Sequence, residues 1–106
     1  MDSNSRKRHR IKERIPCNIE LVIDDALICE AFDISEGGVY LHTTHSFNPG
    51  STVKVSLQSK NQNIEVMARV KHCQEGFGMG LMFIDLDDVM KTKIRQLVND
   101  IKKLTP

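Results

Sequence analysis

The sequence predicts an all-β fold, a six-stranded antiparallel β-barrel followed by a C-terminal α-helix. Two observations support this prediction. Six short apolar runs follow one another, separated by turn-forming residues and without a helical pattern between them, which is typical of an antiparallel barrel or sandwich. After about residue 87 the apolar spacing changes to that of an amphipathic helix. We prefer a barrel to a sandwich because closure leaves no exposed strand edge in so small a sheet.

The first three predicted strands lie in the N-terminal half of the chain. Alternating apolar residues predict a half-buried strand over Cys17–Ile23, and the denser run Ala26–Phe32 predicts a second strand after an Asp24-Asp25 turn. Residues 33–38 read Asp-Ile-Ser-Glu-Gly-Gly and predict a turn, because Asp and Ser form local hydrogen bonds and Gly permits positive φ and close backbone approach. The third strand is predicted over Val39–Thr43.

The other three strands follow in the second half of the chain. Apolar runs, most of them alternating with polar residues, predict strands over residues 53–57, 64–71 and 78–84, with turns or polar loops over residues 48–50, 59–63 and 74–76. Each strand therefore has one apolar face that can point into a shared core.

The C-terminal helix is predicted over about residues 87–104. Its apolar residues form one stripe, namely Met90, Ile94, Leu97, Val98, Ile101 and Leu104. Asp87 and Asp88 lie at the start, where they favour capping and the helix dipole, and Lys102 and Lys103 lie favourably at the end. We expect this helix to close one mouth or side of the barrel, and a partner-binding or dimerisation helix is the alternative.

The length of 106 residues indicates one domain, with a basic arm over residues 1–14 and the barrel and helix over residues 15–106. The arm holds six Lys and Arg against two acidic residues, whereas the rest holds nine basic and twelve acidic residues. Such an arm is either a flexible, solvated tail or the binding segment for an anionic partner.

Several classes of protein are disfavoured. No apolar run has the length of a membrane span and the charged N-terminus has no apolar signal segment, so a cytoplasmic location is predicted. Cys17, Cys29 and Cys73 are odd in number and lack C-x-x-C spacing, which predicts reduced thiols in the strands. His42 and His45 need not converge at a strand end, so no metal site is predicted. Neither a nucleophile motif nor paired acids indicate an enzyme, and no cofactor is predicted.

Two short motifs support the functional prediction. Arg10 and Arg14, separated by three residues as Arg-x-x-x-Arg, precede the first strand, and an Asp-x-Ser-x-x-Gly sequence at Asp33, Ser35 and Gly38 begins about twenty residues later. The planar arginine fork matches both phosphate and the O6/N7 edge of guanine. A carboxylate complements the N1–H and N2–H₂ donors of guanine, and glycines let the backbone approach a flat ring. These residue types suit a ligand that contains guanine and phosphate.

The order of the two motifs resembles that of the PilZ domain, the bacterial receptor module for cyclic di-GMP. The composite motif is far more specific than either half. The segments Ile15-Pro16, Asn48–Gly50 and Gly78–Phe83 also look like the family pattern, and the resemblance covers about residues 8–104. It implies a six-stranded β-barrel with a C-terminal helix.

The resemblance also implies the roles of individual residues. Arg10 and Arg14 would grip guanine and phosphate, while Asp33 and Ser35 hold the other side of the ligand. The full set of implied ligand-binding residues is Arg10, Arg14, Asp33, Ser35, Gly38, His9, Gly37 and Gly80. His9 is a departure, because many members have Arg there, and this position influences whether one ligand molecule or a stacked pair is bound.

Three functions are consistent with these features. The leading one is a cyclic di-GMP receptor that converts the level of this second messenger into a conformational signal or into binding of a downstream protein. A ligand-independent interaction adaptor is the alternative, although such members usually lack the motifs. A nucleic-acid binder that uses the basic arm is the third, but Tyr40 and four Phe residues are the only aromatic residues and several fit the core, so nucleic acid is not a predicted partner.

Overall fold

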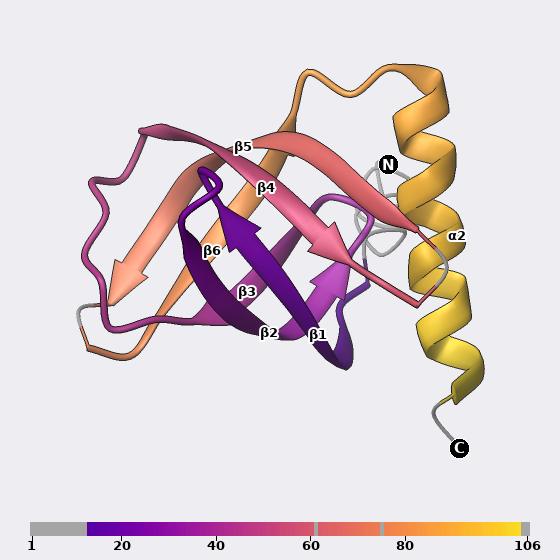
Figure 1. Ribbon diagram of the computed structural model, residues 1–106, viewed down its shortest axis with the longest axis horizontal. Coiled ribbons are helices and arrows are strands. Elements are labelled where there is room, and N and C mark those ends of the chain that lie inside the picture. The colour runs from indigo at the N-terminus through magenta and orange to yellow at the C-terminus, as the bar shows by residue number, and fades with distance from the viewer. Residues whose placement is uncertain (1–12, 61, 75, 105–106) are drawn as a thin grey trace, which may run out of the picture.

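The computed structural model describes residues 13–60, 62–74 and 76–104. These residues form six strands and one helix, namely β1 (Ile15–Ile23), β2 (Leu27–Ser35), β3 (Gly38–His42), β4 (Thr52–Gln58), β5 (Asn63–Gln74), β6 (Gly78–Ile84) and α2 (Asp88–Leu104) (Figure 1). The strands close an antiparallel barrel in the order β1-β2-β3-β6-β5-β4, and β4 pairs with β1. The predicted fold class is therefore confirmed.

The hydrophobic core fills the interior of this barrel. On β4 and β5, every second residue is buried, as the alternation in the sequence predicts. The largest fully buried side chains come from all six strands and from α2, and they are Leu21, Ile23, Ile34, Leu41, Leu57, Ile64, Met79, Ile94, Val55 and Val70. Burying such side chains is the main favourable contribution to folding.

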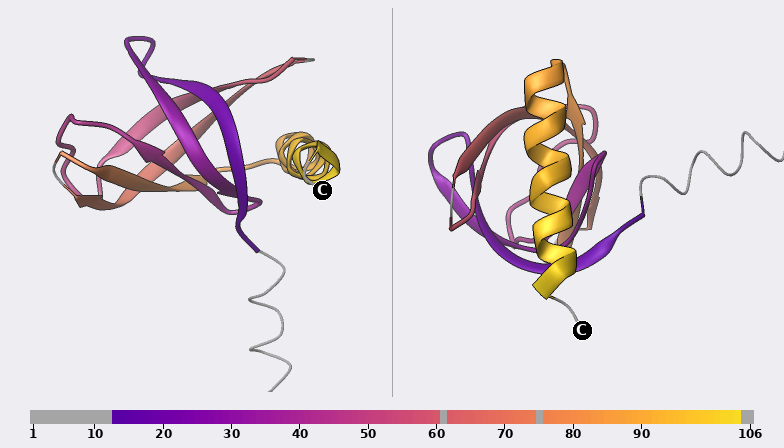
Figure 2. Two further views of the ribbon diagram at one scale, coloured as in Figure 1. Left: turned by 90° about the horizontal axis from the view of Figure 1, so that it is seen from below. Right: turned by 90° about the vertical axis from the view of Figure 1, so that its right-hand side faces the viewer.

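Helix α2 lies across one mouth of the barrel (Figure 2). Ile94, Leu97 and Val98 of the predicted stripe are buried there, and the helix contacts β5 and β1. Leu104, at the end of the stripe, is 79% exposed and does not pack. The Asp87 carboxylate accepts a hydrogen bond from the backbone amide of Met90 at 2.8 Å, which is the N-cap that the sequence predicts. The helix thus closes the barrel.

The turn predicted over residues 33–38 is shorter in the structure. Strand β2 continues to Ser35 and β3 begins at Gly38, so only Glu36 and Gly37 connect them. The reason is a β-bulge, because the register of β2 against β3 shifts between Ala31 and Asp33. The predicted end of the second strand at Phe32 was wrong, because the extra residue of the bulge breaks the two-residue alternation from which strands are predicted.

The bulge changes which side chains of β2 face outward. Ala31 and Ile34 are buried, whereas Phe32 and Asp33, the two residues between them, are both partly exposed. In a regular strand Asp33 would share the inward face with Ala31. The bulge therefore places the Asp33 carboxylate on the outside of the barrel.

A second bulge extends β5 beyond its predicted end at residue 71. The register of β5 against β6 shifts between Val70 and His72. Val70 is buried, and the next two residues, Lys71 and His72, are both exposed. The strand then continues to Gln74, so this bulge also directs two consecutive side chains outward.

All three cysteines are free thiols, as predicted. Burial raises the pKa of the Cys17 thiol to about 11, and the nearby Asp33 charge adds to the effect. Burial likewise raises the pKa of Cys29. In the part of the chain that the structure describes, no helix is both long enough and apolar enough to cross a membrane.

Candidate functional site

The strand register places Asp33, Ser35 and Gly38, the Asp-x-Ser-x-x-Gly part of the motif, on one outer face of the barrel. One cross-strand row consists of Asp33, Tyr40, Gly80 and His72, on β2, β3, β6 and β5 in turn. The next outward row consists of Ser35, Gly38, Met82 and Arg69 on the same strands. We call these two rows, with Arg14 beside them, the site face. The bulges of β2 and β5 lie on strands that form it, and they set which residues face outward. A further register shift, of β1 against β2, lies between Pro16 and Ile19.

Arg14 and Asp33 form the charged part of the site face. Arg14 Nη1 lies 3.7 Å from Asp33 Oδ1, which is an ion pair but is too long for a hydrogen bond. The Arg14 guanidinium also lies 5.9 Å from the centroid of the Tyr40 ring, within the range of cation–π attraction. The two groups are unequally exposed, since the side chain of Arg14 is 59% exposed and that of Asp33 is 24% exposed.

Asp33 Oδ1 is buried and has no hydrogen-bond partner among the described residues. Most buried polar atoms in proteins are hydrogen-bonded, so an exception requires an explanation. A buried carboxylate oxygen that lacks a donor carries an unfavourable desolvation free energy, which a donor from a ligand would offset. This oxygen therefore indicates a place where a bound molecule would present an N–H group.

The short turn between β2 and β3 is held by two hydrogen bonds. The Gly37 amide donates to Ser35 Oγ at 3.1 Å, and the Phe83 amide of β6 donates to the Gly37 carbonyl at 2.9 Å. At Gly38, a Cβ atom would overlap the carbonyl oxygen of Leu81. Gly38 is thus required because two strands approach each other closely, and it has no positive φ. The sequence analysis gave both close approach and positive φ as reasons for glycine in this turn, and only close approach is confirmed at Gly38.

An open pocket of about 340 Å³ lies on this face. Its lining residues are Arg14, Ser35, Gly37, Gly38, Lys71, His72, Gly80, Leu81 and Met82. Five of the eight predicted ligand-binding residues line it together, and Asp33 adjoins it through the ion pair with Arg14. The other two, His9 and Arg10, lie outside the described residues.

Residues in or beside the pocket that were not among the predicted ligand-binding residues include Lys71, His72 and Tyr40. Lys71 and His72 were assigned to the end of a strand and to the residues beyond it, and only the bulge directs both to the pocket. Tyr40 was considered for the core, but it lies on the outer face. A Cβ atom at Gly80 would lie 3.2 Å from the Tyr40 ring, so the ring covers β6 where glycine leaves room. The alternation of Tyr40 with the buried Val39 and Leu41 was the available signal.

Tyr40 is also supported from its other side. The Phe32 ring lies 5.0 Å from the Tyr40 ring and 4.0 Å from the His42 ring, measured between centroids. These rings form a small aromatic cluster outside the barrel, and the cluster holds Tyr40 in a fixed position beside Arg14. His42 is engaged in this cluster, and no group of three or more His, Cys, Asp or Glu side chains is placed to hold a metal within the described residues.

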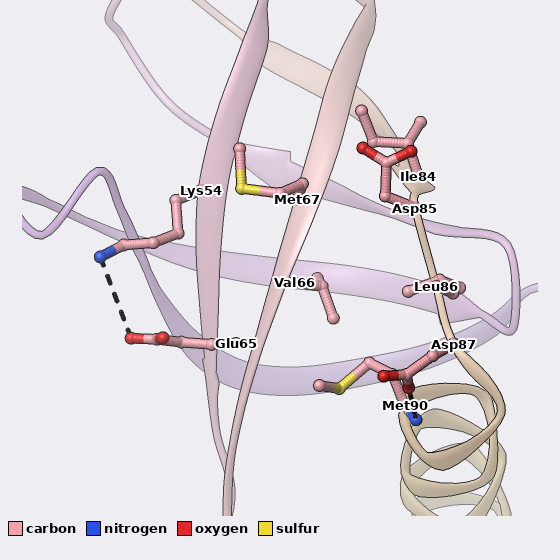
Figure 3. A pocket seen from close by; sticks show the side chains of 9 residues that line it. All are labelled: Lys54, Glu65, Val66, Met67, Ile84, Asp85, Leu86, Asp87 and Met90. Carbon is pink, nitrogen blue, oxygen red and sulfur yellow. Dashed lines mark hydrogen bonds and ion pairs between the residues drawn. The ribbon is translucent and has the colours of Figure 1, made fainter.

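A second pocket lies where β4, β5 and β6 meet the start of α2 (Figure 3). Its residues are Lys54, Glu65, Val66, Met67, Ile84, Asp85, Leu86, Asp87 and Met90. Three of its four charged groups are already engaged, since Lys54 Nζ lies 2.6 Å from Asp25 and 4.0 Å from Glu65, and Asp87 caps the helix. None of the predicted site residues lies there, so the site face is the better candidate.

The chain belongs to the PilZ domain family. The family pattern matches residues 4–100, which is most of the sequence. This match agrees with the motif residues and with the closed six-stranded barrel. A search of curated proteins found no match.

Three solved structures are similar in fold. The inhibitor of motility MotI (DgrA) of Bacillus subtilis superposes with a TM-score of 0.73 at 16% identity, over 88% of this chain and 50% of that one. The PilZ domain of CeSA from a cellulose-synthesizing bacterium gives 0.68 at 20% identity, over 85% and 98%. PlzA of Borreliella burgdorferi, solved in complex with cyclic di-GMP, gives 0.62 at 18% identity, over 92% and 44%. This chain thus spans about half of MotI and less than half of PlzA, and identities this low show the fold alone.

Proposed function

We propose that this chain binds cyclic di-GMP in the pocket of the site face and passes that event on to a protein partner. The buried Asp33 oxygen without a hydrogen-bond donor, 3.7 Å from Arg14, carries the proposal. Guanine presents two adjacent donors, N1–H and N2–H₂, which a carboxylate complements. An arginine beside that carboxylate then meets the O6/N7 edge or a phosphate.

Each predicted residue has a role in this proposal. Arg14 contacts guanine or phosphate from a position fixed by Asp33 and Tyr40. Arg10, four positions before Arg14 in the sequence, would add a second guanidinium from the N-terminal segment. Ser35 Oγ accepts a hydrogen bond from the Gly37 amide. The hydroxyl hydrogen of Ser35 is therefore available to donate a hydrogen bond to an anionic oxygen of the ligand. Gly38 and Gly80 line the pocket and have no side chain that would project into it.

The family supports the same ligand. The sequence belongs to the PilZ family and has both parts of the composite motif, and the related PlzA has been solved with cyclic di-GMP. The basic residues of segment 1–14 would be attracted by the two phosphates. We propose a binding module rather than an enzyme, because the pocket holds charged and backbone groups that suit recognition.

Calorimetric titration with cyclic di-GMP tests the proposal and reports the stoichiometry, which decides between one ligand molecule and a stacked pair. Arg14→Ala should weaken binding by at least tenfold, since it removes charge-assisted hydrogen bonds. Arg6→Ala is the matched control, with the same charge change outside the motif, and should have a much smaller effect. Circular dichroism checks that both variants fold. If the wild-type protein does not bind, the ligand-independent adaptor becomes the better hypothesis.

Selectivity between cyclic dinucleotides tests the role of Asp33. Cyclic di-AMP lacks the N1–H and N2–H₂ donors, so it should bind at least tenfold more weakly than cyclic di-GMP. Asp33→Asn preserves the shape of the side chain but replaces one acceptor by a donor, and it should reduce this preference. Equal affinities of the wild-type protein for the two ligands would mean that the pocket recognises only phosphate.

A further inference from the structure

We propose that the bulged segment of β5 forms a second wall of this ligand pocket, in which Lys71 contacts a phosphate and His72 stacks against a base. This inference rests on the proposed function and adds two residues to it. Neither residue belongs to the two motifs. Both are placed by the irregular pairing of β5 with β6.

The bulge is the geometric basis of the proposal. In a regular strand, Lys71 and His72 would point to opposite faces. Here the register shifts between Val70 and His72, both Lys71 and His72 are exposed, and both line the pocket with Arg14. Strand β6 separates them from β3, and its residue in the row is Gly80, whose lack of a side chain lets the Tyr40 ring and the His72 ring approach this strand.

The charges of the pocket favour a phosphate contact at Lys71. Arg14 forms an ion pair with Asp33, so its charge is partly balanced within the protein. Lys71 has no ion pair or hydrogen bond to any described side chain, whereas Lys54 and Arg95, elsewhere on the barrel and α2, both have carboxylate partners. A cation that lines a pocket without a carboxylate partner is a suitable contact for a phosphate dianion or diester.

His72 is placed to interact with a flat ring. A Cβ atom at Gly80 would lie 3.6 Å from His72 Cδ2 and 3.2 Å from the Tyr40 ring, so the two rings approach Gly80 from opposite sides. A nucleobase stacks on an aromatic ring whatever its identity, because every base has a π-face. His72 would therefore add affinity without adding preference for guanine, which is the role of Asp33.

Substitution of Lys71 tests the phosphate contact. Lys71→Met keeps most of the aliphatic stem and removes the charge, and it should weaken cyclic di-GMP binding by about fivefold at low salt. The loss should shrink as salt is raised, since the contact is exposed and is screened. Lys71→Arg should bind like the wild type. Lys91→Met on α2 is the matched control and should have no effect. If Lys71→Met binds cyclic di-GMP like the wild type while Arg14→Ala binds it more weakly, the proposed phosphate contact of Lys71 is wrong and the proposed function stands.

Substitution of His72 tests the stacking contact. His72→Ala should weaken cyclic di-GMP and cyclic di-AMP by the same factor, about fivefold, and His72→Phe should restore both. In the wild-type protein, ligand should shift the ring-proton NMR signals of His72, which requires no variant. Unchanged His72 signals at saturation, or a loss confined to cyclic di-GMP, would overturn the stacking role. Absence of any wild-type binding would overturn both this inference and the proposed function.

Discussion

The mouth of the barrel under α2 and the site face follow opposite physical rules. At the mouth, Ile94, Leu97 and Val98 are buried and the helix start is capped by Asp87, so apolar surface is covered and polar groups are paired. On the site face, a buried carboxylate oxygen has no hydrogen bond within the described residues, and two strands depart from regular pairing. Helix α2 therefore stabilises the fold, whereas the bulged strands β2 and β5 form the pocket.

An ion pair between described residues connects the two regions. Arg95 Nε of α2 lies 3.4 Å from Glu36 Oε1, in the turn between Ser35 and Gly37. Because Ser35 and Gly37 line the pocket, this contact joins the helix to the part of the site face that a ligand would touch. The two regions are therefore adjacent in space.

The largest expected effect is on the stability of the mouth. Leu97→Ala should lower the free energy of unfolding by about 3 kcal/mol, because it removes a buried side chain and leaves a cavity. Denaturant unfolding measures this loss. Cyclic di-GMP affinity, measured where the variant is folded, should stay unchanged, and a large loss of affinity would show that the two regions are not separable.

A smaller loss of stability is expected on the site face. Gly38→Ala should lower the free energy of unfolding by about 2 kcal/mol, since its Cβ meets backbone atoms of Leu81 that cannot move independently. Gly80→Ala is the matched control, because its Cβ would lie 3.2 Å from the Tyr40 ring, a contact that a shift of about a few tenths of an ångström relieves. Gly80→Ala should lower the free energy of unfolding by less than half as much as Gly38→Ala. Equal stabilities of the two variants would contradict the requirement for close approach at Gly38.

The regular parts of the molecule could be predicted from the sequence, and the irregular parts could not. Apolar runs, most of them alternating with polar residues, identified all six strands, and the stripe through Ile94 and Leu97 identified the helix and its buried face. The bulges insert one residue into a pattern of period two, so the sequence placed Asp33 and Ser35 in a turn rather than at the end of β2.

In the site, too, some residues could be predicted from the sequence and others could not. The motif types predicted that Arg14, Asp33 and Ser35 act together, and the strand register brings them together. Lys71 and His72 were missed because no local pattern records which residues of β5 lie opposite Gly80. That information resides in the pairing of strands, which a single sequence specifies only through the whole barrel.

The ion pair between the regions should have a weaker effect. Arg95 is 54% exposed and Glu36 is 29% exposed, so Arg95→Gln should change the free energy of unfolding by no more than about 0.5 kcal/mol. A double-mutant cycle with Glu36→Gln, at low and high salt, isolates the pair. The coupling should fall as salt is added, and a coupling that is large and independent of salt would show that the pair is more deeply integrated than its exposure indicates.

The smallest expected effect uses Cys17 as a probe of the Asp33 charge. Cys17 lies on β1, and its thiol pKa is raised to about 11 by burial and, to a lesser extent, by Asp33. At pH 8 only about one thiol in a thousand is therefore ionised, and since the thiolate is the nucleophile, alkylation should be slow and should accelerate about tenfold per pH unit toward pH 10. Site-resolved mass spectrometry after a short iodoacetamide pulse measures this rate.

Asp33→Asn removes the negative charge that disfavours the thiolate, so the pKa of Cys17 should fall and its alkylation at fixed pH should become faster. Glu30→Gln, an exposed carboxylate on the same strand β2, is the matched control and should leave the rate unchanged. Identical rates in the wild-type and Asp33→Asn proteins would mean that the carboxylate is screened or protonated at the pH of the assay. The Asp33 oxygen would then be a weaker acceptor for guanine than the proposed function requires, so this small effect tests the group on which the site face depends.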